Sequence, residues 1–110
     1  MGGGIMVKYK LDRPLKILTV CGVGQGSSLI MRMFVEDVLK ELQIPAKVEH
    51  TELLTAKSSD ADVIIASILH AEEFEGSTKI IIGLKNLVDK NEIRKKILDA
   101  LSKRGIIELD

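Results

Sequence analysis

A glycine-rich run between a predicted strand and a predicted helix constrains the fold of this chain more than any other feature. Residues 15–20 are mostly aliphatic and predict a short, buried β-strand. Residues 29–42 place Met31, Val35 and Val38 at helical spacing, which predicts an amphipathic helix. The eight residues between them therefore join a strand end to a helix start. They are Cys21, Gly22, Val23, Gly24, Gln25, Gly26, Ser27 and Ser28.

This connection has the composition of an anion-binding loop. Its three glycines let main-chain N–H groups turn inward, because no Cβ atom obstructs them. Ser27 and Ser28 add hydroxyl donors or a helix N-cap, and the start of the following helix favours negative charge. We therefore expect residues 22–28 to hold a phosphate group.

Cys21 is the only cysteine of the chain and stands where the predicted strand ends. A lone cysteine is most often a small, buried and unreactive side chain. Here glycine-rich and polar residues follow it, which favours an accessible thiol, and the positive end of the next helix would favour its thiolate. We predict that Cys21 is the nucleophile and that residues 22–28 form its phosphate-binding loop.

The rest of the chain continues the alternation of strands and helices. Strands are predicted over residues 46–50, 63–66 and 80–82, and helices over residues 52–59 and from residue 89 onward. Asp89 and Glu92 resemble a capping box, and Gly105 is a C-cap glycine. Nearly continuous aliphatic strands between helices predict an α/β fold with a parallel sheet covered on both faces. Ligands of such sheets bind beyond the carboxyl ends of the strands, where residues 67–70 and 83–86 should join Cys21.

Residues 16–28 resemble the phosphorylation loop of the IIB component of the bacterial sugar phosphotransferase system (PTS), most closely the ascorbate-type branch of the lactose/ascorbate group. The similarity rests on the Cys-Gly-x-Gly-Gln-Gly-Ser-Ser run and extends over about residues 15–101. It implies a flavodoxin-like, PTS IIB-like fold with four parallel strands in the order 2-1-3-4. It also implies a IIB-type domain over residues 15–104, preceded by an N-terminal extension (1–14) and followed by a tail (105–110).

The same resemblance implies a function. Cys21 would accept a phosphoryl group from a phosphorylated IIA protein. It would then pass the group to a sugar, ascorbate or a related one, bound by a membrane IIC component. The chain would thus be a phosphotransferase that lies in the cytoplasm and reaches the membrane only through IIC.

Composition excludes several other classes of protein. Sixteen basic residues balance sixteen acidic ones, so no charge excess points to a nucleic acid. The apolar stretches are only strand-length, which predicts no direct membrane insertion, and one cysteine fits a reducing compartment. A nucleotide triphosphatase loop would need lysine where Gly26 stands, and a thioredoxin-like site would need a second cysteine. No metal-ligand cluster or cofactor motif is visible, so we expect neither.

Two other functions stay open at this point. Small tyrosine phosphatases use a similar sheet and a cysteine nucleophile, but they place an arginine where this chain has Ser27. A phosphorylation-dependent regulatory module would keep the same loop and bind a transcription factor or sensor. The roles of His50, His70, Arg32 and Lys85 are also open, because each could serve the site or only solvate the surface.

Overall fold

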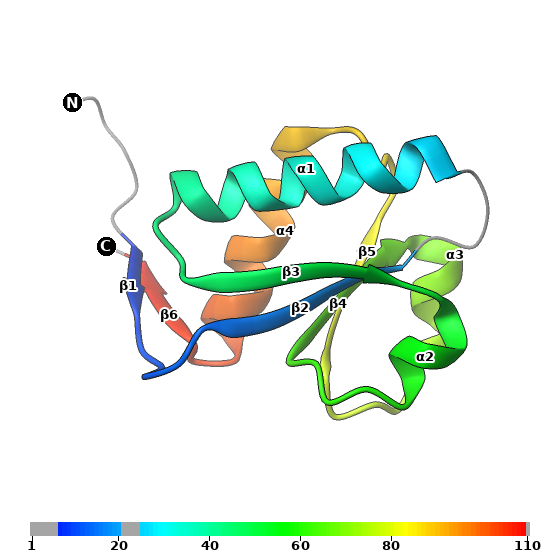
Figure 1. The fold of residues 1–110 in the computed structure, drawn as a ribbon. Coiled ribbons are helices and arrows are strands. Elements are labelled where there is room, and N and C mark those ends of the chain that lie inside the picture. Colours follow the sequence, from blue (N-terminus) through cyan, green and yellow to red (C-terminus); the bar gives the residue numbers. More distant parts are fainter. Residues whose placement is uncertain (1–6, 21–24, 110) are drawn as a thin grey trace.

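A computed structural model describes residues 7–20 and 25–109 of the chain (Figure 1). All four predicted strands and both later helices are present, with bounds within a few residues of those expected. None of the helices in these ranges is long and apolar enough to cross a membrane. The elements are β1 (Val7–Tyr9), β2 (Leu15–Val20), α1 (Gln25–Glu41), β3 (Ala46–Thr51), α2 (Leu53–Lys57), β4 (Val63–Ser67), α3 (Ile68–Ala71), the 3₁₀ helix η1 (Glu72–Phe74), β5 (Ile80–Leu84), α4 (Lys90–Lys103) and β6 (Ile107–Leu109).

Four parallel strands form the main sheet in the order β3-β2-β4-β5. This order confirms the predicted arrangement 2-1-3-4, because β2 is the first of the four strands along the chain. Val20, at the end of β2, is paired with Thr51 of β3 on one side and Ala66 of β4 on the other. The winding of the chain therefore reverses beside β2, which is where open α/β sheets form their ligand crevice.

Helices α1 and α4 cover one face of the sheet (Figure 1). Along β2, Leu15 and Ile17 point to this face, as the two-residue period of a strand requires. The helices supply residues at spacings of three or four, so each presents one apolar stripe. The buried helical residues are Met31, Val35, Val38 and Leu39 of α1 and Ile93, Ile97, Leu98 and Leu101 of α4.

The other face is covered by α2, α3 and η1 over a smaller core. Seven buried residues form this second cluster: Leu18, Val20, Ala56, Ala61, Ile64, Ala66 and Phe74. Helix α3 approaches the sheet closely at Gly83, where an added Cβ atom would lie 3.1 Å from Cβ of Ala71 and 3.3 Å from Cα of Ile68. Both faces of the sheet are thus covered, as predicted, and the absence of a side chain at Gly83 sets how closely α3 can pack.

A second, two-stranded sheet joins the two ends of the described chain. β1 pairs with β6 in antiparallel register, with Lys8 opposite Glu108. Tyr9 and Ile107 are paired in the same ladder, and Ile107 is buried in the larger core. Neither segment is predicted as a strand from the sequence, because three residues show too little periodicity to be recognised. Both segments lie outside the predicted boundaries of the IIB-type domain.

The ends of α4 follow the sequence signals in part. Asp89 is the N-cap, and its carboxylate accepts hydrogen bonds from the backbone N–H groups of Asn91 (3.0 Å) and Glu92 (3.2 Å). At the other end, Gly105 has φ +74° and its N–H donates to the carbonyl of Ser102, while the Ile106 N–H donates to that of Leu101. This pair of bonds is a Schellman motif, which confirms the predicted C-cap glycine.

Candidate functional site

The carboxyl edge of the main sheet is where the sequence places the site. β2 ends at Val20, which is fully buried, and α1 begins at Gln25. The connection between them therefore starts at the switch point of the sheet and ends at a helix N-terminus. The predicted nucleophile Cys21 and the loop residues Gly22, Val23 and Gly24 lie in this connection, outside the described residues, so their roles stay predictions.

The other four predicted loop residues belong to α1. Residues 25–28 form its first turn, so the predicted helix start at residue 29 is wrong by four residues. Leu29 and Ile30 are exposed and Met31 is fully buried, so the amphipathic pattern begins only where the helix meets the core. The first N–H groups of a helix lack intrahelical acceptors. The backbone donors of Gln25, Gly26, Ser27 and Ser28 therefore belong to a helix terminus, which favours anions.

Ser67 and His70 form a tight turn at the end of β4, beside β2. Ser67 is the last residue of the strand and the N-cap of α3, and its Oγ accepts a hydrogen bond from the His70 N–H at 3.3 Å. The same Oγ lies 2.8 Å from Nδ1 of His70. The predicted loop of residues 67–70 therefore leads into the short helix α3, and the Ser67 hydroxyl fixes the position of the His70 imidazole. Because Ala66 is paired with Val20, Ser67 stands one residue beyond the last residue of β2.

Glu92 holds the loop that follows β5. Its carboxylate accepts hydrogen bonds from the backbone N–H groups of Lys85 (2.6 Å) and Asn86 (3.0 Å). Lys96 contacts the same carboxylate at 2.9 Å and donates to the carbonyl of Gly83. Burial raises the pKa of Glu92, but the bonds from Lys85, Lys96 and Asn86 outweigh it and lower the pKa to about 2. The predicted capping box is thus only half right, because Glu92 serves the loop after β5 rather than the start of its own helix.

Thr19 and His50 form a contact that the sequence analysis did not predict. Thr19 is fully buried in β2, and its Oγ1 lies 3.2 Å from Nδ1 of His50 on β3. Parallel pairing sets these two residues opposite each other. The sequence does contain a signal for this contact, because Thr19 is a hydroxyl residue inside an otherwise aliphatic strand. A buried hydroxyl needs a hydrogen-bond partner. His50 on β3 and His70 on α3, directly after β4, therefore lie on the two sides of β2, and each has Nδ1 next to a hydroxyl.

The remaining candidates are surface residues in the structure. Arg32 is half-buried on α1 and lies 3.9 Å from Glu36 one turn later, a spacing typical of a solvated helix face. Lys85 is exposed after β5. In the described ranges, no group of three or more His, Cys, Asp or Glu side chains is arranged to hold a metal ion.

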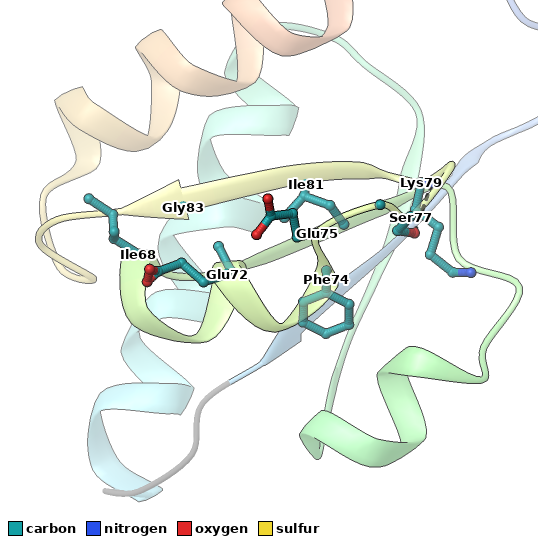
Figure 2. Close-up of a pocket in the computed structure, with 10 residues that line it drawn as sticks. Ile68, Glu72, Phe74, Glu75, Ser77, Lys79, Ile81 and Gly83 are labelled. Atoms are coloured by element: carbon teal, nitrogen blue, oxygen red, sulfur yellow. Dashed lines mark hydrogen bonds between the residues drawn. The ribbon is translucent and has the colours of Figure 1, made fainter.

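A hollow of about 440 Å³ lies beside β5, α3 and η1 (Figure 2). Ile68, Phe74 and Ile81 give it an apolar lining, and Glu72 of η1 and Glu75 directly after it also line it (Figure 2). Among its lining residues, Ile68 and Gly83 also belong to the segments predicted to join Cys21.

Residues 16–99 match the family described as "PTS system, Lactose/Cellobiose specific IIB subunit". The chain belongs to this PTS IIB family. The match runs from the second residue of β2 through most of α4, so it covers the main sheet and leaves out β1 and β6. The resemblance found in the sequence is confirmed, and so is the enzyme class, because PTS IIB proteins are phosphotransferases.

Individual relatives agree with this PTS IIB assignment. The chain is 40% identical over 93 residues to the "Ascorbate-specific PTS system EIIB component" of Mycoplasma pneumoniae, which covers 82% of this chain and 98% of that protein. A protein of the same description from Shigella sonnei is 38% identical over 90 residues, or 79% of this chain and 89% of that protein.

A solved structure supports the fold. The lactose-specific IIB domain of Streptococcus pneumoniae superposes with a TM-score of 0.51 at 13% identity and covers 80% of this chain and 98% of that one. At this identity the superposition speaks for the fold alone.

Proposed function

We propose that this PTS IIB protein carries a phosphoryl group on Cys21. A phosphorylated IIA protein would deliver the group, and a sugar bound by a membrane IIC component would receive it. The observation that carries the proposal is the position of Cys21 in the chain. It follows directly after Val20, the end of a central strand, and precedes α1 by only three residues. Membership of the PTS IIB family supports the same reading.

The proposed transfer needs a nucleophile and anion donors but no metal. The Cys21 thiolate attacks the phosphorus atom of a phosphohistidine, the N–P bond breaks as the S–P bond forms, and the imidazole leaves. In the second step a sugar hydroxyl attacks, the S–P bond breaks, and the hydroxyl proton passes to a base on the acceptor protein. Backbone N–H groups of residues 22–28 would hold the phosphoryl oxygens in both steps.

We infer that the sugar is ascorbate or a related compound. Relatives at 37–40% identity are described as ascorbate-specific, whereas the lactose-specific domain shares only 13% of its residues with this chain. We place the carrier in the cytoplasm, because its single cysteine suits a reducing compartment. Contact with the membrane would come through IIC.

The deciding experiment is phosphorylation in a reconstituted system. The chain is incubated with phosphoenolpyruvate, the general PTS proteins and a cognate IIA protein, and its intact mass is measured. One added phosphoryl group, about 80 Da, is expected on Cys21. Membranes that contain the cognate IIC component and its sugar should then remove it within the mixing time.

Two controls separate the alternatives. Cys21→Ser should accept no phosphoryl group, and Ser102→Ala, in the last turn of α4 and outside the candidate site, should still accept one. Incorporation on a histidine would show that the acceptor is assigned wrongly. Cys21-dependent release of inorganic phosphate from a phosphotyrosine analogue would favour the phosphatase reading, which the chain makes unfavourable because Ser27 stands where that family has arginine.

A further inference from the structure

His70 is held by the fold in a way that a solvated histidine does not require. Its Nδ1 lies 2.8 Å from Oγ of Ser67, and its backbone N–H donates to the same oxygen at 3.3 Å. His70 is half-buried, whereas Leu69 before it is 77% exposed and Ile68 is 40% exposed. Burial of apolar area alone would favour the reverse arrangement. The position of the ring is therefore set by its hydrogen bonds.

The Ser67–His70 pair lies beside the strand end that precedes Cys21. Ala66 of β4 is paired with Val20, the last residue of β2, so Ser67 stands one residue beyond that pair. Figure 1 shows α3 at the end of the sheet where β2 stops. The peptide bond from Val20 to Cys21 thus ties the proposed nucleophile to the strand end that Ser67 adjoins.

The proposed phosphate-binding loop contains no basic side chain. Residues 21–28 include no lysine, arginine or histidine, so a phosphoryl dianion there would depend on backbone N–H groups and hydroxyls. Residues 67–71 supply one ionisable side chain, which is His70. An imidazole is therefore available at the same edge of the sheet as the loop that lacks one.

The acidic residues that follow α3 have other surroundings. Glu73 pairs with Lys57 of α2 at 3.4 Å, and Glu72 lines the hollow beside β5. Within the described residues, the hydrogen bond of the His70 ring goes to the Ser67 hydroxyl rather than to a carboxylate. The second ring nitrogen, Nε2, is thus left for a group outside residues 7–20 and 25–109.

The hydroxyl of Ser67 selects which ring nitrogen donates. A serine oxygen has two acceptor positions and one proton. In Ser67 one acceptor position takes the His70 backbone N–H, and the proton is free to point to Nδ1. The neutral imidazole then carries its own proton on Nε2, the nitrogen farther from the backbone. His70 is accordingly preorganised to donate a hydrogen bond through Nε2.

We propose that His70 donates a hydrogen bond from Nε2 to the phosphoryl group on Cys21, and that Ser67 is the residue that positions the ring. This inference rests on the proposed function. As the S–P bond forms and the N–P bond breaks, the phosphoryl oxygens carry negative charge, and a fixed donor stabilises that charge without reorganisation. His70 keeps its proton in both transfer steps. It therefore adds one side-chain donor to the backbone N–H groups of residues 22–28.

Two substitutions of His70 separate the roles of its two nitrogens. The amide of His70→Asn takes the place of Nδ1, whereas the longer side chain of His70→Gln carries its amide to the place of Nε2. Phosphoryl transfer from purified phosphorylated IIA protein is measured for each. We expect kcat to fall about ten- to a hundredfold in His70→Asn but only a few-fold in His70→Gln. KM for the donor should change little in both, because the lost contact is made during transfer.

A kcat for His70→Asn that equals that of the wild type, or exceeds that of His70→Gln, would overturn the proposal. Either result would show that transfer does not need a donor at Nε2. A wild type that accepts no phosphoryl group would instead show that the proposed function fails. The two failures are therefore distinguished by the wild type alone.

Ser67→Ala tests the positioning role. Without the hydroxyl the ring loses its orientation, so kcat should fall about three- to tenfold, and Ser67→Thr should restore it. Ser102→Ala is the matched control. Ser102 is also half-buried, and its Oγ donates to the carbonyl of Asp99 at 3.1 Å in α4. An unchanged kcat in Ser67→Ala, or an equal fall in Ser102→Ala, would contradict the role of Ser67.

Nitrogen-15 NMR of the imidazole gives a measurement that a purely structural role would not change. In the wild type the His70 ring should be protonated on Nε2, and the Nε2 shift should move when Cys21 is phosphorylated and return when the group is released. In Ser67→Ala the tautomer with its proton on Nδ1 should appear. An Nε2 shift that does not respond to phosphorylation would overturn the proposal while the proposed function stands.

Discussion

Glu92 on α4 and Lys85 after β5 are joined by a hydrogen bond of 2.6 Å from the Lys85 backbone N–H to the Glu92 carboxylate. The same carboxylate accepts the Asn86 N–H and contacts Lys96, so one side chain holds two consecutive backbone N–H groups of the loop after β5. The turn stays in place because Glu92 belongs to a helix whose next residue, Ile93, is fully buried. The Glu92 carboxylate, whose side chain is only 16% exposed, thus links helix α4 to the loop after β5.

Glu92→Gln should destabilise the protein in a pH-dependent way. The pKa of Glu92 falls from 4.5 to about 2 in the folded protein, so its carboxylate stabilises the fold above pH 4.5 and loses this effect as the pH falls toward 2. This difference corresponds to about 3 kcal/mol at neutral pH. Urea denaturation should therefore show a loss of about 1–3 kcal/mol at pH 7, since the amide can still accept one of the two N–H groups.

The difference between Glu92→Gln and the wild type should shrink between pH 4.5 and pH 2. Glu108→Gln is the control, because Glu108 lies on β6 in an exposed ion pair with Lys10. It should show little loss at either pH. An equal loss for Glu92→Gln at pH 7 and at pH 2.5 would mean that the charge of Glu92 does not stabilise the loop.

Gly83→Ala should weaken the packing of α3 against β5. The added Cβ atom would meet Ala71 at 3.1 Å and the backbone of Ile68 at 3.3 Å, and neither can move without displacing α3. We expect a loss of about 1–3 kcal/mol in the free energy of unfolding. Amide chemical shifts of residues 67–71 should change with it. Gly76→Ala is the comparison: an added Cβ meets nothing within 4 Å, although φ is +87°, so it should cost stability without moving α3.

Gln43→Gly should stabilise the protein. Gln43 has φ +58° at the end of α1, and its N–H donates to the Lys40 carbonyl while the Ile44 N–H donates to that of Leu39. This is the same Schellman geometry that Gly105 adopts after α4, but with a side chain in the left-handed region. Thermal denaturation should show a gain of about 0.5–1 kcal/mol for Gln43→Gly and a loss of about 1 kcal/mol for Gly105→Ala. A loss in both variants would contradict the comparison.

Arg13→Gln should raise the pKa of Asp62 toward its ordinary value. Two hydrogen bonds, at 2.7 and 2.8 Å, join the Arg13 guanidinium to the Asp62 carboxylate. They lower its pKa against the effect of burial, with help from the Lys16 N–H. The carboxylate titration can be followed by NMR. Because Arg13 is 56% exposed, the loss of stability at pH 7 should be at most about 1 kcal/mol, and it should vanish as Asp62 protonates on acidification.

Lys103→Gln is the control for this titration. Lys103 is the last residue of α4 and pairs with Asp99 at 3.2 Å, and both side chains are more than half exposed. Its replacement should leave the titration of Asp62 unchanged. A shift of Asp62 in both variants would indicate a general effect of net charge rather than the Arg13 contact.

Elements with local signals can be predicted from the amino-acid sequence. The aliphatic runs predict β2, β4 and β5, because a strand buried on both faces must be apolar along its length. Asp89 and Gly105 mark the ends of α4, because helix caps satisfy backbone groups only a few residues away. The glycine-rich run after Cys21 was specific enough to indicate the PTS IIB family, which the match over residues 16–99 confirms.

Several contacts depend on the tertiary structure, because no local pattern of residues specifies them. The partner of Glu92 is a loop six and seven residues upstream, although its position in the helix suggested a local cap. β1 and β6 lie near opposite ends of the described chain and pair with each other. Each strand has only three residues, and an isolated two-stranded sheet of this length is not stable. The early start of α1 and the exposure of apolar residues on α1 and α3 also have no local signature, because burial depends on which surfaces the fold leaves uncovered.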